Sequence, residues 1–259
     1  MIIPGDPSMV QALVVLLAAP LVGSFLGVLV KRLPTAEPVF LSRSRCPHCA
    51  SRLGVRDLIP VVSWLVARGH CRFCGKKIGF FYPLIEIAAI GIAAWAISVV
   101  PMWLVWPTSL LGWALLVLSL IDLKDRILPD CLTLPLVVAG LGMSWMLDPG
   151  NLWLHALAAG TGFLASLAID MAYRRFRGRS GLGRGDAKLI AASGAWVSLS
   201  GLPSVILIAS ATALIWVVLR RRGTANLSAA TVVPFGPFLA LATWIVWLHG
   251  PLRLGTSFM

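Results

Sequence analysis

Two of the ten acidic residues in this 259-residue chain lie where an apolar run meets a polar loop. Asp122 directly follows the apolar residues 115–121, and Asp186 directly precedes another apolar run in Gly183-Arg-Gly-Asp186. Ionisable groups at membrane depth are costly and are therefore candidates for function. Two carboxylates a few ångströms apart share a proton, and such a pair can activate water and protonate a scissile carbonyl oxygen. The two aspartates therefore predict an aspartic hydrolase.

The residues around the two aspartates leave a second interpretation open. Gly183 and Gly185 would let the backbone approach a neighbouring helix or an extended substrate closely, which suits an active site. Asp186 is equally suited to capping its own helix, and Asp125 and Asp130 are equally suited to be ordinary loop charges. The residue types and spacing alone do not decide between catalysis and these structural roles.

Asp170 is a further acidic residue inside an apolar run. Arg174 follows it at the i,i+4 spacing of helical neighbours. The spacing predicts an ion pair between the two side chains.

Four of the five cysteines form two C-x2-C pairs, Cys46 with Cys49 and Cys71 with Cys74, and 21 residues separate the pairs. This spacing is typical of a zinc site in which four thiolates surround the metal tetrahedrally. Because all four positions would be filled by sulfur, we expect a structural metal. Disulfides are the alternative, but the loop is predicted to be cytoplasmic, where thiols stay reduced.

The composition shows what kind of molecule positions these groups. Apolar residues make up 58% of the chain and charged residues 12%, about half the charged fraction of a soluble domain. We therefore expect an all-α, polytopic membrane protein with about eight transmembrane helices. The predicted spans are residues 9–30, 84–100, 102–121, 131–147, 152–173, 187–199, 202–219 and 231–248.

The basic residues predict the orientation of these spans. The chain carries 22 Lys and Arg residues and a net charge of +12, and they gather in the loops 31–83, 122–130, 174–186 and 220–230. The positive-inside rule places these loops in the cytoplasm, with the N-terminus and the turns near residues 101, 149 and 201 outside. Membrane topology thus accounts for the charge, which argues against nucleic-acid binding. The first span lacks the basic start of a signal peptide and is expected to be retained.

The same pattern predicts three regions. Residues 1–30 form the first transmembrane helix, residues 31–83 form a cytoplasmic zinc-binding module, and residues 84–259 form the membrane domain that carries both aspartates. Under this topology the aspartates lie at the cytoplasmic face.

Short motifs run along nearly the whole chain. They are Gly23-Ser-Phe-Leu26, Arg32-Leu-Pro34, Arg45-Cys-Pro-His-Cys49, Ile59-Pro-Val-Val-Ser-Trp-Leu65, Arg68-Gly-His-Cys-Arg-Phe-Cys-Gly75, Tyr82-Pro-Leu-Ile-Glu86, Leu128-Pro-Asp130, Thr133-Leu-Pro135, Gly183-Arg-Gly-Asp186 with Lys188, Gly194-Ala-Trp196 and Pro234-Phe-Gly-Pro237. Together these motifs resemble those of the type IV prepilin peptidases, also called prepilin leader peptidase/N-methyltransferases. One departure is Gly27, where that family often has asparagine.

The resemblance implies a two-step activity in a bacterial inner membrane. Asp122 and Asp186 would cut a leader peptide from type IV prepilins or pseudopilins after a glycine at the cytoplasmic face. The enzyme would then methylate the new N-terminal residue from S-adenosylmethionine. The resemblance makes Asp125, Asp130 and Lys188, with the two glycines of the second motif, supporting residues.

The methyl-transfer step has weaker sequence support, because the chain lacks a strand followed by GxGxxG. The cysteine module is the expected location. Glu86 is a candidate acid-base or amine-binding group, with an ordinary membrane-border carboxylate as the alternative.

Two other classes of protein fit some of these features. A transporter could use interior carboxylates to relay ions, although transporter sites usually lie at the midplane of the membrane. A non-catalytic scaffold could use the metal module for docking. Oligomeric state is not predicted by any pattern in the chain.

Overall fold

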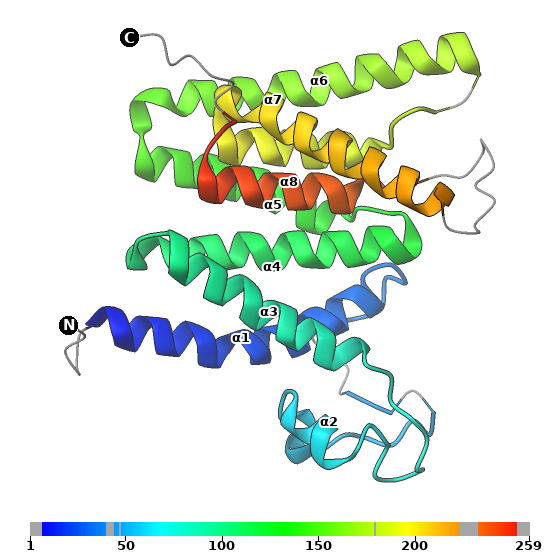
Figure 1. Cartoon of the computed structure of the whole chain (residues 1–259). Coiled ribbons are helices and arrows are strands. Elements are labelled where there is room, and N and C mark those ends of the chain that lie inside the picture. The colour runs from blue at the N-terminus through cyan, green and yellow to red at the C-terminus, as the bar shows by residue number, and fades with distance from the viewer. Residues whose placement is uncertain (1–6, 40–43, 47, 179, 223–232, 253–259) are drawn as a thin grey trace. The chain divides into compact units, whose positions relative to one another are not determined.

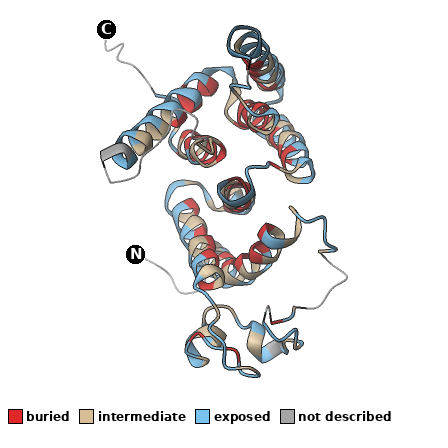
Figure 2. Ribbon diagram, turned by 90° about the vertical axis from the view of Figure 1, so that its right-hand side faces the viewer, coloured by how far each residue is buried: buried red, intermediate tan, exposed pale blue. Residues whose placement is uncertain are grey.

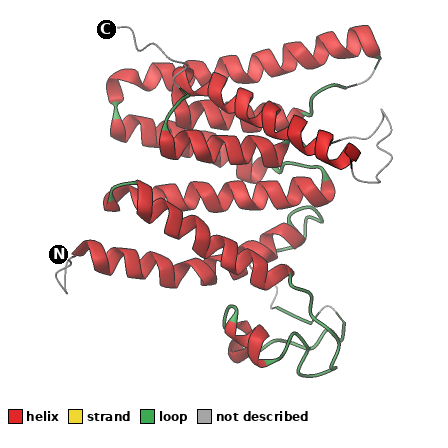
Figure 3. Cartoon of the chain, viewed as in Figure 1, coloured by secondary structure: helices red, strands yellow, loops and turns green. Residues whose placement is uncertain are grey.

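The computed structural model describes residues 7–39, 44–46, 48–178, 180–222 and 233–252. Within these ranges the chain forms helices joined by loops and turns, without a β-strand (Figure 3). The all-α prediction is confirmed for this part of the chain. Pro47 of the first cysteine pair, and residues 223–232, which hold most of the last basic loop and the start of the last predicted span, lie outside the described residues.

The helices group into two compact units, Met1–Trp113 and Ala114–Met259. The helix α4 (Met102–Asp125) continues from one unit into the other (Figure 1). The first unit also contains α1 (Pro7–Arg32), the 3-10 helix η1 (Val55–Leu58), α2 (Val62–Val66) and α3 (Phe81–Val99). The second also contains α5 (Asp130–Leu147), η2 (Pro149–Asn151), α6 (Leu152–Arg177), α7 (Arg184–Arg222) and α8 (Gly236–His249).

Six of the described helices, α1 and α3 to α7, are long and apolar enough to cross a membrane. Helix α8 is apolar but has only 14 residues. Each predicted span is therefore matched by a helical segment once the two arms of α7 are counted separately. This agreement confirms the prediction of a polytopic helical membrane protein.

Helix α7 changes direction at Ser198, whose backbone has φ 65° and ψ 178°. Figure 1 shows the two arms, yellow and then orange, as separate rods. They correspond to the sixth and seventh predicted spans. A single residue outside the helical region of φ and ψ is enough to turn the chain. The turn expected near residue 201 therefore lies at Ser198.

Small residues allow the helices within each unit to pack closely, as is common in membranes. A Cβ atom on Gly23 of α1 would lie 2.6 Å from the Cα of Glu86 on α3. In the second unit, a Cβ on Gly194 of α7 would lie 2.7 Å from the backbone of Ala158 on α6. Buried residues accordingly lie along the inward stripes of these helices (Figure 2).

Gly27, the departure from the resembled family, has a structural counterpart in the first unit. A Cβ there would lie 2.8 Å from the ring of Tyr82 at the start of α3. The glycine therefore lets the aromatic ring pack directly against the α1 backbone, and an asparagine would need the ring to move.

Candidate active site and metal centre

Asp122 lies three residues before the end of α4 and is almost completely buried, with 6% of its surface exposed. Its Oδ2 accepts a hydrogen bond of 2.9 Å from the backbone N–H of Gly236, the first residue of α8. A Cβ atom on Gly236 would lie 2.7 Å from the same oxygen. The Asp122 carboxylate therefore lies against a helix N-terminus, where the partial positive charge favours an anion.

Asp186 lies in the first turn of α7 and is half-buried. Its Oδ2 accepts a 3.2 Å hydrogen bond from the backbone N–H of Gly183, so the side chain caps its own helix. A Cβ on Gly185 would lie 2.9 Å from the Cβ of Leu128, which follows α4. The second glycine of the motif thus lets the start of α7 pack against the loop that follows the first aspartate.

These contacts bring the two predicted aspartates into one site within the second unit. The carboxylates of Asp122 and Asp186 lie close enough to repel each other electrostatically. Arg126 interacts favourably with the Asp122 carboxylate. Two neighbouring carboxylates, each at a helix N-terminus, can hold one shared proton and orient a water molecule.

The predicted supporting residues fall into two groups. Lys188 Nζ and Asp130 Oδ1 form a 2.5 Å ion pair that joins the first turns of α7 and α5. Asp125 is exposed and pairs with its neighbour Lys124, at 3.6 Å. The structure thus connects Asp130 and Lys188 to the Asp186 helix and leaves Asp125 at the surface.

Asp170 makes contacts that the sequence did not predict. The expected ion pair with Arg174 is confirmed at 2.8 Å. In addition, Asp170 Oδ1 accepts hydrogen bonds from the Ser180 hydroxyl at 2.7 Å and from the N–H groups of Gly181 and Leu182 at 3.1 and 3.3 Å. This buried carboxylate therefore fixes the loop that leads into the second aspartate motif. No sequence signal marks these contacts, because they depend on how the loop folds back.

The four predicted metal ligands come together in the first unit. The Sγ atoms of Cys46, Cys49, Cys71 and Cys74 lie within 4.8 Å of one another, and the Cys46–Cys74 and Cys49–Cys71 pairs are each 4.0 Å apart. Sulfurs around a tetrahedral zinc are about 3.8 Å apart, given Zn–S distances of about 2.3 Å. The donor set and spacing fit a metal, and the thiols are free of disulfides.

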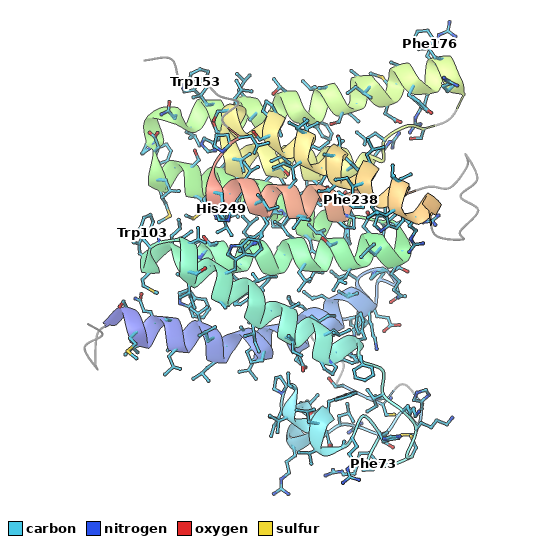
Figure 4. The ribbon with its side chains drawn as sticks, viewed as in Figure 1. Phe73, Trp103, Trp153, Phe176, Phe238 and His249 are labelled. Carbon is cyan, nitrogen blue, oxygen red and sulfur yellow. The ribbon has the colours of Figure 1, made fainter. Side chains whose placement is uncertain are left out.

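Each cysteine pair lies on a tight hairpin. The N–H of Gly75 donates to Cys71 O at 2.8 Å, and the N–H of Ala50 donates to Cys46 O at 2.9 Å. Gly75 and Ala50, which follow the second cysteine of their pairs, both have positive φ, 66° and 55°. The two hairpins therefore repeat one backbone design. Phe73, which Figure 4 labels, belongs to the second hairpin.

A hydrogen bond with the Ser51 side chain lowers the pKa of the Cys49 thiol to about 6. The thiolate is the form of cysteine that binds a metal. The lowered pKa therefore favours the metal-binding form of Cys49 near neutral pH.

Glu86 is buried near the start of α3, with 5% of its surface exposed. Its Oε2 accepts a 2.7 Å hydrogen bond from the N–H of Val61, which precedes α2 in the cysteine-containing segment. It is therefore not an ordinary exposed carboxylate at the membrane border. Its carboxylate instead faces the cysteine-containing segment of the first unit.

Comparison with known proteins shows to which protein family this chain belongs. A family model for the bacterial peptidase A24 N-terminal domain matches residues 17–100, and the type IV leader peptidase family matches residues 109–218. A prepilin leader peptidase/N-methyltransferase from Stutzerimonas stutzeri is 37% identical over 89% of this chain and 88% of its own length. The chain belongs to the type IV leader peptidase family. The resemblance stated from the motifs is thereby confirmed.

Other members of the type IV leader peptidase family match to a similar extent. A protein of the same name from Aeromonas hydrophila is 35% identical over 91% of this chain and 90% of its own length. One from Pseudomonas aeruginosa is 36% identical over 89% and 87%. No solved structure matches. The N-terminal family model covers the four cysteines and Glu86, and the second covers both aspartates.

Proposed function

We propose that this protein cleaves the leader peptides of type IV prepilins or pseudopilins and then methylates the new N-terminus. The observation that carries the peptidase part is the pairing of Asp122 and Asp186, one buried and one half-buried, at the N-termini of α8 and α7. The relatives' names, which combine a leader peptidase and an N-methyltransferase, support the two-step activity.

Two carboxylates that share one proton can hydrolyse a peptide bond, because one acts as a base and the other as an acid. The ionised aspartate takes a proton from water while the water oxygen bonds to the scissile carbonyl carbon, and the protonated aspartate donates its proton to the carbonyl oxygen. The aspartate that took the proton from water then gives it to the amine nitrogen, the C–N bond breaks, and a hydroxyl of the intermediate returns its proton to the other aspartate as the new carboxyl group forms. The N–H groups of Gly236 and Gly183 hold Asp122 and Asp186 in position for these transfers.

The proposed orientation follows from the distribution of charge, and the proposed substrate and cleavage position follow from the family relationship. We place cleavage after a glycine at the cytoplasmic face of a bacterial inner membrane, with the N-terminus of this chain in the periplasm. The apolar helix of the substrate would lie in lipid beside the aspartates. The basic loops would bind anionic lipid headgroups, which accounts for the positive charge without nucleic acid.

The cysteine module, residues 31–83, is proposed to hold a structural zinc through its four sulfurs and to support methyl transfer. Residues 1–30 and 84–259 then form the first span and the peptidase domain. When bound, S-adenosylmethionine supplies the methyl group for the new amine. Glu86, buried beside this module, is the residue best placed to interact with that cofactor or with the amine.

Intact mass spectrometry of a purified prepilin mixed with this protein in detergent tests the proposal. The substrate should lose its leader mass, and gain one methyl group only when S-adenosylmethionine is present. Asp122→Asn and Asp186→Asn should each abolish cleavage while the protein keeps its metal. Absence of cleavage of cognate prepilins by folded wild-type protein would contradict the proposal and favour a transporter or a scaffold.

A further inference from the structure

A cavity of about 620 Å³ lies inside the first unit. Its walls come from the C-terminal end of α1, the cysteine module and the start of α3. They include three aromatic side chains, Trp64, Phe73 and Tyr82, together with cationic and anionic groups. Cavities of about 300–1,000 Å³ with apolar walls and a few polar groups are typical of small-molecule sites. The cavity is therefore large enough for a nucleoside-sized ligand.

Glu86 contributes a buried carboxylate to the wall of this cavity. Its partners are neutral, the Val61 N–H and the hydroxyl of Ser24. Among the residues that the structure describes, no Lys, Arg or His forms an ion pair with Glu86. Buried carboxylates are nearly always paired with a cation. Within the described part of the chain, the cavity thus offers a buried anion that no cationic side chain pairs with.

Lys31 and Arg32, two of the cationic residues that line the cavity, contact groups other than Glu86. Lys31 Nζ lies 4.2 Å from the centre of the Tyr82 ring. Arg32 donates hydrogen bonds to the carbonyls of Pro38 and Val39, at 3.2 and 3.1 Å. Within the described residues Glu86 therefore has hydrogen-bond partners but no printed ion pair, and a bound cation would complete its surroundings.

A strained turn holds the Glu86 carboxylate in place. Val61 has φ 58° and ψ −51°, and the N–H of Val62 donates to the carbonyl of Pro60 at 2.5 Å. Positive φ is rare and strained for a β-branched residue. Such strain gathers at binding and catalytic sites, where surrounding contacts maintain it. Here the N–H of the strained residue itself binds Glu86.

We infer that this cavity binds S-adenosylmethionine and that Glu86 accepts its positively charged sulfonium. The inference rests on the proposed methyl-transfer activity and assigns a location to its cofactor. The aromatic walls suit the adenine ring, and a carboxylate that is itself buried favours a cation over a neutral ligand of the same shape. The ammonium group of a processed substrate is the other cation that the reaction supplies, and the test separates the two.

Binding of S-adenosylmethionine and of S-adenosylhomocysteine to the full-length, metal-loaded protein in detergent is the direct measurement. The two ligands differ mainly by the methyl group and its positive charge. Isothermal titration should show wild-type protein binding the charged ligand more tightly. Glu86→Gln keeps an acceptor for the Val61 N–H but removes the charge. It should weaken S-adenosylmethionine binding by about tenfold or more and S-adenosylhomocysteine binding by less than about threefold.

Two further variants keep the test decisive. Asp148→Asn makes the same chemical change at an exposed carboxylate outside the cavity lining and should bind both ligands as wild type does. Ala67→Phe fills the cavity from another wall without touching the carboxylate and should weaken both ligands together. Metal content and elution volume of each variant report whether it folds, so the result does not depend on Glu86→Gln alone.

Unchanged S-adenosylmethionine affinity in folded Glu86→Gln and Ala67→Phe would overturn the inference. A Glu86→Gln variant that binds S-adenosylmethionine normally but needs more processed pilin for methylation would assign Glu86 to the ammonium group and overturn the sulfonium contact. Wild-type protein that neither binds S-adenosylmethionine nor methylates would instead contradict the methyl-transfer part of the proposed function. If wild-type protein methylates but the cavity variants bind normally, only the cavity assignment fails.

Discussion

Gly236 lies so close to Asp122 that no side chain fits between the two residues, since a Cβ would be 2.7 Å from the carboxylate oxygen. We predict that Gly236→Ala displaces Asp122 or the start of α8 and lowers the rate of leader cleavage by about 100-fold, because small displacements of catalytic groups have effects of this size. Cleavage of a prepilin followed by mass spectrometry measures the change. Gly160→Ala, where a Cβ meets nothing within 4 Å, should cleave normally. Equal rates for both variants would mean that the Gly236 contact does not position the aspartate.

Gly75 has φ 66° in the second cysteine hairpin. A side chain in this left-handed conformation costs about 1–2 kcal/mol, so Gly75→Ala should weaken metal binding by roughly five- to thirtyfold, because hairpin folding and metal binding are coupled. Competition with a chromophoric chelator measures the affinity. Gly79→Ala is the matched control, since Gly79 does not have positive φ and a Cβ there meets nothing within 4 Å. Indistinguishable affinities would show that the hairpin backbone does not limit metal binding.

At the scale of elements, the loop between α6 and α7 is held by one side chain from α6. Removing it in Asp170→Ala should free the N–H groups of Gly181 and Leu182, which now donate to Asp170 Oδ1. We expect faster hydrogen exchange at these two amides and at least a tenfold loss of leader cleavage. Exchange in the buried middle of α7 should stay unchanged.

Asp148→Ala removes an exposed carboxylate elsewhere in the same unit and provides the control. Lost activity in Asp170→Ala with unchanged exchange at Gly181 and Leu182 would rule out a positioning role for this carboxylate. Lost activity with faster exchange along the whole of α7 would indicate general unfolding instead.

At the scale of the whole molecule, metal removal should separate the two proposed activities. The cysteines belong to the first compact unit and both aspartates to the second. A strong chelator should therefore release the metal and abolish methylation, while leader cleavage falls by less than about twofold. Mass spectrometry of the product with metal analysis measures both effects, and added zinc should restore methylation. Loss of cleavage in step with the metal would show that the peptidase depends on the cysteine module.

The sequence predicts the helices well because apolar runs of membrane length have few alternatives in lipid. The residues predicted as a site, Asp122 with Asp186 and the four cysteines, do come together in the structure, and their motifs are what made them visible in the sequence. The break of α7 is not predictable at Ser198, because serine has no intrinsic preference for φ 65° and tertiary packing must impose it.

Contacts between residues far apart in the sequence are the other feature that sequence patterns do not predict. Gly236 is 114 residues from Asp122, and although Pro234-Phe-Gly-Pro237 is visible as a motif, its role as a donor to the aspartate is not. The Val61 bond to Glu86 spans 25 residues and depends on a strained turn. Such partners follow from how helices pack, and residue spacing alone does not specify that packing.

The short length of two helices has a consequence for the lipid around the second unit. The first arm of α7, residues 184–197, and α8 both contain about 14 residues, and both begin at the aspartate pair. At 1.5 Å per residue each is about 21 Å long, against a hydrocarbon core of about 30 Å. Such hydrophobic mismatch is relieved by local thinning of the bilayer, which would bring interfacial water to the aspartates without a channel. Leader cleavage should therefore be faster in vesicles of short-chain lipids than in long-chain ones at equal fluidity, and a rate independent of chain length would mean that water reaches the carboxylates by another route.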